Sequence, residues 1–311
     1  MSEISEIFSS LSVNDKLVKP IIKWVGGKTQ ILDKIIDKFP AEINNYHEIF
    51  LGGGSVLLAL LSQEKNKKIK INGCVYAYDI NETLINMYKD IQNNHNELYD
   101  ELQLLIAEFN SCGKGALNRK PTIVDAKLNK ENYYYWIRHL YNTDNTGISG
   151  SAKFIFLNKT CFRGVFRMGP NGFNVPYGHY ANPEIINKEH LDEMHDLIQN
   201  VVFRCCGFEI SMAECRPGDF VYLDPPYAPV NINSFVGYTK DGFTLEQHKS
   251  LFNLIKLCPS KIMMSNADVK LVREYFEDKK YNIISLSCKR SINSKKPGAK
   301  ANEVIITCFI I

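Results

Sequence analysis

Two adjacent prolines, Pro225 and Pro226, come shortly after the apolar run Phe220–Leu223. The run has the composition of a β-strand. Proline has no backbone N–H and holds φ at about −65°, so the strand must end here, and the second proline keeps the first extended. The rigid segment therefore presents the carboxylate of Asp224, backbone carbonyl groups and the ring of Tyr227 at the carboxyl end of a strand. Such a set suits the gripping of a planar amino group at its edge, although a plain loop can have the same composition.

A second informative feature is the glycine turn Gly52–Gly54, which separates the strand-like run Tyr46–Phe50 from a helix-like run. Small residues at such a turn let the backbone approach a ligand closely. The turn does not fit the dinucleotide fingerprint, because the third glycine position holds Leu57. The segment Gly26–Thr29 does not fit a phosphate-binding P-loop either, because the first glycine position holds Ile22.

Asp79 closes the next strand-like run, Cys74–Asp79. An acid in this place after a glycine turn can accept hydrogen bonds from both ribose hydroxyls of an adenosyl group. The order of strand, glycine turn, helix, strand and acid therefore favours an adenosyl site. A tight turn followed by a surface acid is the alternative.

The alternation of strand-like and helix-like runs divides the chain into parts. Residues 20–91 and 201–311 alternate regularly, which predicts one discontinuous α/β domain with a parallel sheet and right-handed crossovers. Residues 92–200 hold helical runs, many aromatic side chains and the turn sequence Gly169–Gly172, which is typical of a β-hairpin. Residues 1–19 are expected to form an N-terminal tail. Helices are predicted over 28–39, 56–61, 81–91, 93–110, 131–141, 152–160, 244–257 and 267–277, and strands over 46–50, 74–79, 201–206, 219–223, 260–265, 281–288 and 302–309.

Composition limits the remaining classes of protein. The 311 residues carry a formal net charge of +3, which permits a nucleic-acid partner without requiring one. The 9 cysteines show no CxxC spacing, which favours free thiols in a reducing compartment such as the cytoplasm. No apolar run reaches the roughly 18 residues of a membrane span, and the N-terminus has no signal pattern. We expect neither a membrane partner nor a metal.

Several short motifs follow one another in the order of a known enzyme family. Together they resemble the site-specific DNA adenine-N6 methyltransferases of the Dam family, the D12 class. The resemblance spans residues 20–307 and implies S-adenosylmethionine as cofactor, a Rossmann-like methyltransferase sheet and an inserted, mostly helical target-recognition domain at 92–200 that carries the hairpin. The matching segments are Lys23–Lys28, Glu48–Val56, Asp79–Asn81, Phe156–Phe162, Phe173–Gly178, Asp224–Pro229 and Lys289–Ile292.

The resemblance also assigns residues to the cofactor and to catalysis. The implied cofactor contacts are Trp24, Lys28, Phe50, Gly52, Gly54, Asp79, Ile80 and Asp224, with Phe208 added from its place after a strand-like run. The implied catalytic segment is Asp224, Pro225, Pro226 and Tyr227.

The chemistry of this segment follows from the adenine amino group. The N6 lone pair is delocalised into the ring, so the amine is a poor nucleophile. The carboxylate of Asp224 and the carbonyl of Pro225 would accept its two protons and direct the lone pair at the methyl group, so that positioning and electrostatics carry most of the rate. The ring of Tyr227 would stack on the base, which must leave a duplex to reach such a pocket.

The predicted hairpin region carries side chains that we expect to read duplex DNA. By the resemblance, Phe162 takes an intercalating position and Arg167 reads guanine in the major groove. Arg163 stands where the family pattern commonly has Asn, so GATC and a related palindrome such as CATG both remain open as targets. The expected DNA contacts are Lys23, Lys159, Phe162, Arg163, Arg167, Lys289 and Arg290, of which the last two belong to a basic run that faces either phosphates or solvent.

Other interpretations remain open. The same fold could methylate cytosine N4, RNA adenine or protein glutamine, although an acid at the first position of the tetrapeptide favours adenine. A catalytically silent DNA-binding relative is a further alternative. The biological role (restriction-modification, replication marking or viral genome modification) and the oligomeric state are not fixed by the sequence.

Overall fold

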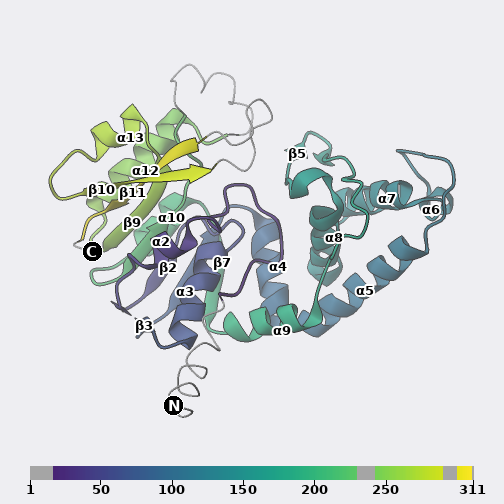
Figure 1. Cartoon of the computed structure of the whole chain (residues 1–311), viewed down its shortest axis with the longest axis horizontal. Coiled ribbons are helices and arrows are strands. Elements are labelled where there is room, and N and C mark those ends of the chain that lie inside the picture. The colour runs from purple at the N-terminus through teal and green to yellow at the C-terminus, as the bar shows by residue number, and fades with distance from the viewer. Residues whose placement is uncertain (1–16, 230–241, 290–299, 310–311) are drawn as a thin grey trace, which may run out of the picture.

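The computed structural model describes residues 17–229, 242–289 and 300–309. A seven-stranded sheet forms the centre of one lobe, and a mostly helical lobe lies beside it (Figure 1). The strand order across the sheet is β10-β11-β9-β8-β2-β4-β7. These strands are β2 (Tyr46–Glu48), β4 (Val75–Asp79), β7 (Val201–Cys205), β8 (Phe220–Leu223), β9 (Lys261–Ala267), β10 (Asn282–Lys289) and β11 (Lys300–Thr307).

All neighbouring strands of this sheet are parallel except for the pairs that β11 makes. Strand β2 pairs with β4 and β8, β4 with β7, and β8 with β9, all in parallel. Strand β11 is antiparallel to both β9 and β10. The predicted parallel α/β sheet is confirmed, with one reversed strand. Because β11 runs backwards, its early residue Glu303 pairs with Ala267, the last residue of β9.

The sheet is buried on both faces, which explains the apolar composition of β8. Side chains alternate between the faces of a strand, so Phe220 and Tyr222 join one buried cluster while Val221 and Leu223 join the other. Helices α2, α3 and α4 contribute to the first cluster, and α10, α12 and α13 to the second. Their bounds are α2 (Leu32–Ile36), α3 (Ser55–Lys65), α4 (Glu82–Asn93), α10 (Phe208–Glu214), α12 (Leu245–Leu257) and α13 (Lys270–Tyr275).

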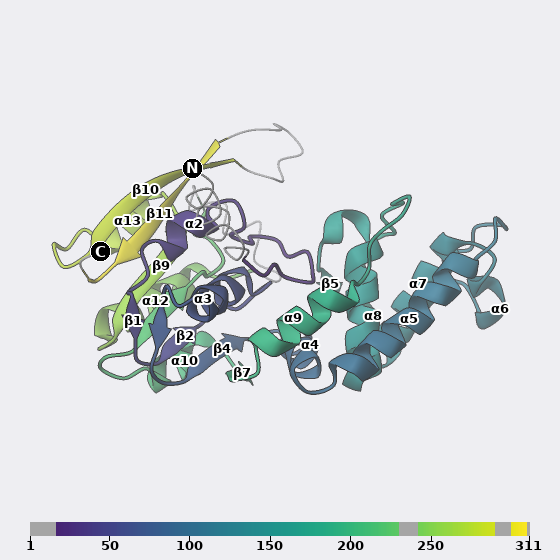
Figure 2. The same ribbon diagram turned by 60° about the horizontal axis from the view of Figure 1, so that its bottom comes forward.

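The helical lobe lies within the connection from β4 to β7. Helices α4 and α9 lie where the two lobes meet (Figure 2). The predicted hairpin is present as β5 (Met168–Gly169) and β6 (Gly172–Phe173), on the side of the lobe nearest the sheet (Figure 1). The remaining elements are α5 (His95–Ser111), α6 (Ile123–Ala126), α7 (Lys130–Thr143), α8 (Gly147–Thr160), the 3-10 helix η1 (Phe162–Gly164) and α9 (Lys188–Leu197), with a separate parallel pair of β1 (Glu42–Ile43) and β3 (Lys70–Ile71).

Some helix predictions were wrong. The predicted helix 28–39 is reduced to α2, because the N–H of Ile31 bonds to the carbonyl of Lys28 (2.9 Å), so the residues before α2 form a turn. The predicted helix 267–277 begins only at Lys270, because Ala267 is still paired in the sheet. Helices α9 and α10 were not predicted. A signal for α9 was available, since Asn187 caps it by accepting a hydrogen bond from the N–H of His190 (2.8 Å).

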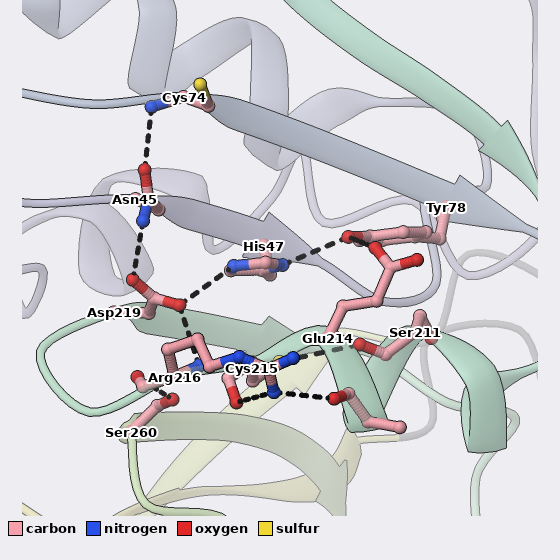
Figure 3. Close-up of polar contacts among 11 residues, drawn as sticks. Asn45, His47, Cys74, Tyr78, Ser211, Glu214, Cys215, Arg216, Asp219 and Ser260 are labelled. Atoms are coloured by element: carbon pink, nitrogen blue, oxygen red, sulfur yellow. Dashed lines mark hydrogen bonds and ion pairs between the residues drawn. The ribbon is translucent and has the colours of Figure 1, made fainter.

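A buried polar network starts at the amino ends of the parallel strands (Figure 3). Asp219, directly before β8, accepts a hydrogen bond from Asn45 Nδ2 (2.8 Å) and lies 3.2 Å from Nε2 of His47. The other ring nitrogen of His47 lies 3.1 Å from the hydroxyl of Tyr78, which donates to Glu214 (2.7 Å). These residues, Asn45, His47, Tyr78, Glu214 and Asp219, are termed the amino-edge network.

Within the described part of the chain, the helices are too short or too polar to span a bilayer. The same residues contain no group of three or more His, Cys, Asp or Glu side chains that could hold a metal ion. Every cysteine whose side chain the structure describes is a free thiol.

Candidate active site

A cavity of about 890 Å³ lies at the carboxyl ends of β2, β4 and β8. Open parallel sheets bind their ligands at this edge. The predicted site residues that line the cavity are Trp24, Lys28, Phe50, Gly52, Asp79, Ile80, Phe208, Asp224, Pro225, Pro226 and Tyr227. The structure thus brings the glycine turn, the acid after β4 and the proline segment together around one space.

Gly54, also expected to contact the cofactor, does not line this cavity. It is the N-cap of α3 with φ of 71°, in the left-handed region that favours glycine. A Cβ at this position would lie 2.1 Å from the hydroxyl oxygen of Tyr88. That hydroxyl donates to the carbonyl of Gly53 (2.8 Å), so the turn lies tightly against α4.

Trp24 covers the glycine turn from the side of the helical lobe. A Cβ on Gly52 would lie 3.1 Å from Cδ1 of Trp24, so backbone and indole are in close contact. The indole also stacks on Phe166, which precedes the hairpin, with 5.4 Å between ring centroids. Trp24 therefore joins the cavity wall to the helical lobe.

Asp79 ends β4 with its carboxylate held by backbone groups. Its Oδ2 accepts from the N–H of Gly52 (2.9 Å), and its Oδ1 accepts from the N–H of Asn81 (2.9 Å). Burial raises the pKa of Asp79, and these N–H groups oppose the increase. Each carboxylate oxygen keeps a second lone pair, which can accept from a ligand hydroxyl.

The carboxylate of Asp224 has one paired and one unpaired oxygen. Oδ2 lies 2.6 Å from the ammonium of Lys28, which also donates to the carbonyl of Gly26 (2.9 Å). Oδ1 is buried and has no hydrogen-bond partner among the described residues. Burial raises the pKa of Asp224, and Lys28 offsets part of this increase. Because buried acceptors normally have a donor, Oδ1 marks a position where a ligand N–H group fits.

Tyr227 is contacted at its hydroxyl and at its ring. The hydroxyl donates to Oε2 of Glu303 (2.7 Å). The ammonium of Lys28 lies 4.7 Å from the ring centroid, within the range of a cation–π contact. Glu303 lines the cavity and was missed by the sequence analysis, because a lone acid in a strand far from the tetrapeptide carries no signal of its own.

Glu48 is a second acid that was not predicted as a site residue. Its side chain lines the cavity, is only 2% exposed and accepts from the hydroxyl of Tyr46 (2.8 Å). Burial raises the pKa of Glu48 to about 8, and the charge of Asp224 adds to this increase. The carboxyl group therefore holds its proton at neutral pH. An acid that ends a buried strand was the available signal.

Aromatic rings form the apolar wall of the cavity. The ring of Phe50 lies 6.1 Å from that of Phe208 and 6.0 Å from that of Phe243. Ile80, at the same edge, is 80% exposed in spite of its apolar side chain. Apolar and aromatic surface of this kind, with a few polar groups placed around it, is typical of sites for flat organic ligands.

Three of the expected DNA contacts lie in η1 or directly before the hairpin. Phe162 is 48% exposed, and the guanidinium of Arg163 lies 5.1 Å from its ring centroid. Arg163 has a φ of 58°. Arg167 donates from Nε to Oδ1 of Asn174 (2.6 Å) and from Nη2 to the carbonyl of Asn174 (3.3 Å). The hairpin thus holds the Arg167 guanidinium in one orientation.

The other expected DNA contacts are more dispersed. Asn158 accepts from the N–H of Lys23 (2.8 Å) and donates to its carbonyl (2.8 Å), which fixes this segment against α8. Lys159 lines a second cavity of about 810 Å³, and burial together with the charge of Lys23 lowers its pKa. Lys289 ends β10 with its side chain outside the described residues, and Arg290 lies outside them altogether.

The cavity fits an adenosyl group that carries a positive charge. Asp79 offers acceptors beside the glycine turn, Phe50 and Phe208 offer flat apolar surface, and the carboxylate of Asp224 offers a negative charge with a free acceptor atom. A parallel sheet with one reversed strand carries these groups at its carboxyl edge. Fold and site together define a methyltransferase that uses an adenosyl cofactor and acts on an amino group.

Comparison with known proteins gives the family. The model of the D12 class N6 adenine-specific DNA methyltransferases matches residues 24–292, and the chain belongs to this family. The type II methyltransferase M.MjaIII of Methanocaldococcus jannaschii is 38% identical over 308 residues, covering 94% of this chain and 99% of that protein. The type II methyltransferase M1.LlaDCHI of Lactococcus lactis is 30% identical over 314 residues, covering 96% and 98%. A DNA adenine methylase of Haemophilus influenzae is 29% identical over 293 residues, covering 92% of each chain.

The protein is therefore an enzyme that transfers a methyl group from S-adenosylmethionine to N6 of adenine in DNA. Its sheet is the Rossmann-like sheet of S-adenosylmethionine-dependent methyltransferases. The predicted family, activity, cofactor and fold class are confirmed. Family membership favours adenine in DNA over the interpretations as a cytosine, RNA or protein methyltransferase.

Proposed function

We propose that this enzyme methylates adenine within a short, palindromic site of double-stranded DNA, after the base has been flipped out of the duplex into the cavity. The observation that carries the proposal is the buried Oδ1 of Asp224, which has no partner in the part of the chain that the structure describes and lies in a cavity that Tyr227 also lines. An adenine amino group has two N–H donors. One would bond to Oδ1 of Asp224 and the other to the carbonyl of Pro225.

Each side chain of the segment then has a separate task. When bound, S-adenosylmethionine supplies an electrophilic methyl group on a positively charged sulfur. Lys28 holds Oδ2 of Asp224, which leaves Oδ1 as the acceptor for an N6 proton. The two acceptors would pull the N–H groups out of the base plane, so that the N6 lone pair leaves conjugation with the ring, and Tyr227 offers its ring for stacking. Positioning and electrostatic preorganisation of this kind are large contributors to enzymatic rates.

We assign the remaining cavity residues to the cofactor. Asp79 would accept from its ribose, and the exposed side chain of Ile80 together with the rings of Phe50 and Phe208 would cover its base. Trp24 and Gly52 would form the side of the pocket nearest the glycine turn, and Gly54 would support that turn without touching the cofactor. The cofactor and the adenine would thus share one cavity, as a direct methyl transfer requires.

The segment 92–200 would act as the target-recognition domain. The exposed ring of Phe162 is suited to enter the base stack beside a flipped adenine, and Arg167, held by Asn174, is suited to read a guanine edge. The stack of Trp24 on Phe166 supports this proposal, since it ties the cavity wall to the residues before the hairpin. Arg163 and Lys23 would contact the same duplex, and Lys159, Lys289 and Arg290 would add phosphate contacts.

The DNA substrate and the free cysteines together indicate the cellular compartment in which the enzyme works. We propose that the enzyme works in the cytoplasm, or in another reducing compartment with access to DNA, because duplex DNA is its substrate. The free cysteines of the described residues support a reducing setting.

The test of the catalytic assignment is Asp224→Ala. We expect methyl transfer to DNA to fall by roughly 10³-fold or more, because the acceptor at the reacting nitrogen is lost. Binding of S-adenosylhomocysteine, measured by calorimetry, should change little. Asp33→Ala, which removes an exposed acid on α2, is the control and should keep its rate. An Asp224→Ala rate within about tenfold of that of the unmodified enzyme would overturn the assignment.

The test of the substrate uses unmethylated duplex DNA, single-stranded DNA and RNA of the same sequence with radiolabelled cofactor. Digestion to nucleosides should give N6-methyl-2′-deoxyadenosine from the duplex. A duplex with 2-aminopurine at the target should gain fluorescence on binding, because flipping unstacks the base. Single-molecule sequencing of DNA from expressing cells would decide between GATC, CATG and other sites. Faster methylation of RNA than of duplex DNA would contradict the proposal.

A further inference from the structure

Glu303 lies far in sequence from the tetrapeptide yet bonds to its last residue. We propose that Glu303 is a positioning residue of the methyl-transfer site, which holds the ring of Tyr227 by its hydroxyl in the orientation that an incoming adenine needs. The inference rests on the proposed function, because it takes Tyr227 as the surface on which the base stacks.

The reversed strand is what makes this contact available. Strand β11 is antiparallel to β9, so Glu303 pairs with Ala267 at the edge where the parallel strands end. The neighbouring residue of β9, Asn266, is fully buried, and its Oδ1 accepts from the N–H of Ala228 (3.1 Å). Tyr227 is therefore restrained twice, by β9 at the backbone that follows it and by β11 at the tip of its side chain.

The hydrogen bond from Tyr227 to Glu303 restrains the two torsion angles of the tyrosine side chain. A donor–acceptor distance of 2.7 Å between the hydroxyl and Oε2 of Glu303 is that of a strong bond to a charged acceptor. The ammonium of Lys28 lies 4.7 Å from the ring centroid, so a base must stack on ring surface that this cation leaves free. Without Glu303 the part-buried hydroxyl loses its acceptor, and the ring must turn to find another.

Glu303 also contributes charge. Its carboxylate raises the pKa of Asp224, whereas Lys28 lowers it. Replacing Glu303 by Gln keeps an oxygen that can accept from Tyr227 and removes the charge. The conservative variant therefore separates the restraint from the electrostatic effect. The titratable groups that act on Asp224 or are acted on by it are Lys28, Glu48, Tyr222, Tyr227 and Glu303.

The experiment compares single-turnover methyl transfer by the full chain and its variants on a duplex that the enzyme methylates. We expect Glu303→Ala to lower the rate by roughly 10- to 100-fold through misplacement of the ring. Glu303→Gln should recover most of this loss. In its pH–rate profile the decline at acidic pH should occur at lower pH, because the charge that raises the pKa of Asp224 is gone. Tyr227→Phe, which removes only the hydroxyl, should resemble Glu303→Ala. The variant that combines Glu303→Ala and Tyr227→Phe should be no slower than the slower single variant, because the two substitutions remove the same hydrogen bond.

Controls separate the restraint from folding and from the proposed function. Asn302→Ala changes an exposed neighbour on β11 and should keep its rate. Binding of S-adenosylhomocysteine and the thermal midpoint report whether each variant is folded. If Glu303→Ala does not fold, Tyr227→Phe decides, and an unchanged rate there overturns the inference. Equal rates of Glu303→Ala and Asn302→Ala, or no recovery in Glu303→Gln, would also overturn it. Asp224→Ala in the same assay tests the proposed function independently.

Discussion

Two buried polar clusters belong to the same sheet and differ in one respect. The amino-edge network surrounds His47, and the site cluster (Lys28, Glu48, Asp224, Tyr227 and Glu303) surrounds the cavity. Among the described residues, the amino-edge network has no buried side-chain polar atom without a partner, whereas the site cluster leaves Oδ1 of Asp224 unpaired. A network whose polar atoms are all hydrogen-bonded stabilises the fold. A buried polar atom without a partner leaves a position at which a ligand can bind. The difference distinguishes Asp219, whose oxygens are both paired, from Asp224, for which we propose a catalytic role.

The sharpest test of this comparison is the effect of the two acids on stability. Asp219→Ala would leave Asn45 and His47 without their acceptor, so we expect the free energy of unfolding to fall by about 3 to 5 kcal/mol. Asp224→Ala removes the carboxylate paired with the ammonium of Lys28, which still donates to the carbonyl of Gly26 and lines the cavity, so we expect a smaller loss, of about 1 to 2 kcal/mol, together with the loss of methyl transfer. Urea denaturation of both variants measures these changes. Equal destabilisation by both would break the distinction.

The pH dependence of stability gives a second test, through Glu48. Its pKa is about 8 in the folded chain, above the ordinary value of 4.5, so the folded state binds the proton more tightly than the unfolded state. Stability should therefore fall as the pH rises through that window, by on the order of 5 kcal/mol over its full width. Glu48→Gln cannot titrate and should lack this fall. Denaturation of both forms at several pH values between the two pKa values measures the difference, and parallel curves would contradict the prediction.

The smallest effect is expected at the far end of the amino-edge network. Tyr78→Phe removes the hydroxyl that donates to Glu214 and lies beside His47. We expect a loss of about 1 to 2 kcal/mol in the free energy of unfolding, since both contacts of the hydroxyl are lost while the ring remains. The methyl-transfer rate at a temperature where the variant is folded should not change. A slower rate would show that the amino-edge network acts on the site.

Sequence reasoning succeeded where neighbouring strands decide the geometry. The prolines end β8, and the acid after β4 and the glycine turn after β2 follow adjacent parallel strands, so their meeting at one edge follows from strand order. The α/β sheet and the hairpin were also predicted, because both depend on the local pattern of residues. The DNA contacts and the division into a catalytic and a recognition domain stay predictions.

The missed features all depend on tertiary contacts. The sequence shows that Lys28 is basic, but only the fold shows that its ammonium pairs with Asp224. Glu303 reaches the cavity because of a reversed strand, which no local pattern shows. Glu48 lines the cavity because it is buried, and its one local signal was an acid at the end of a buried strand.

The reversed strand also orders events during synthesis of the chain. A ribosome makes β11 after every other strand of the sheet, because β11 is the last of them in sequence. A nascent chain that ends at β10 already contains the tetrapeptide, but it lacks Glu303 and the strand that separates β9 from β10. The full set of groups that line the cavity, with Glu303 among them, therefore assembles only once β11 has left the ribosome.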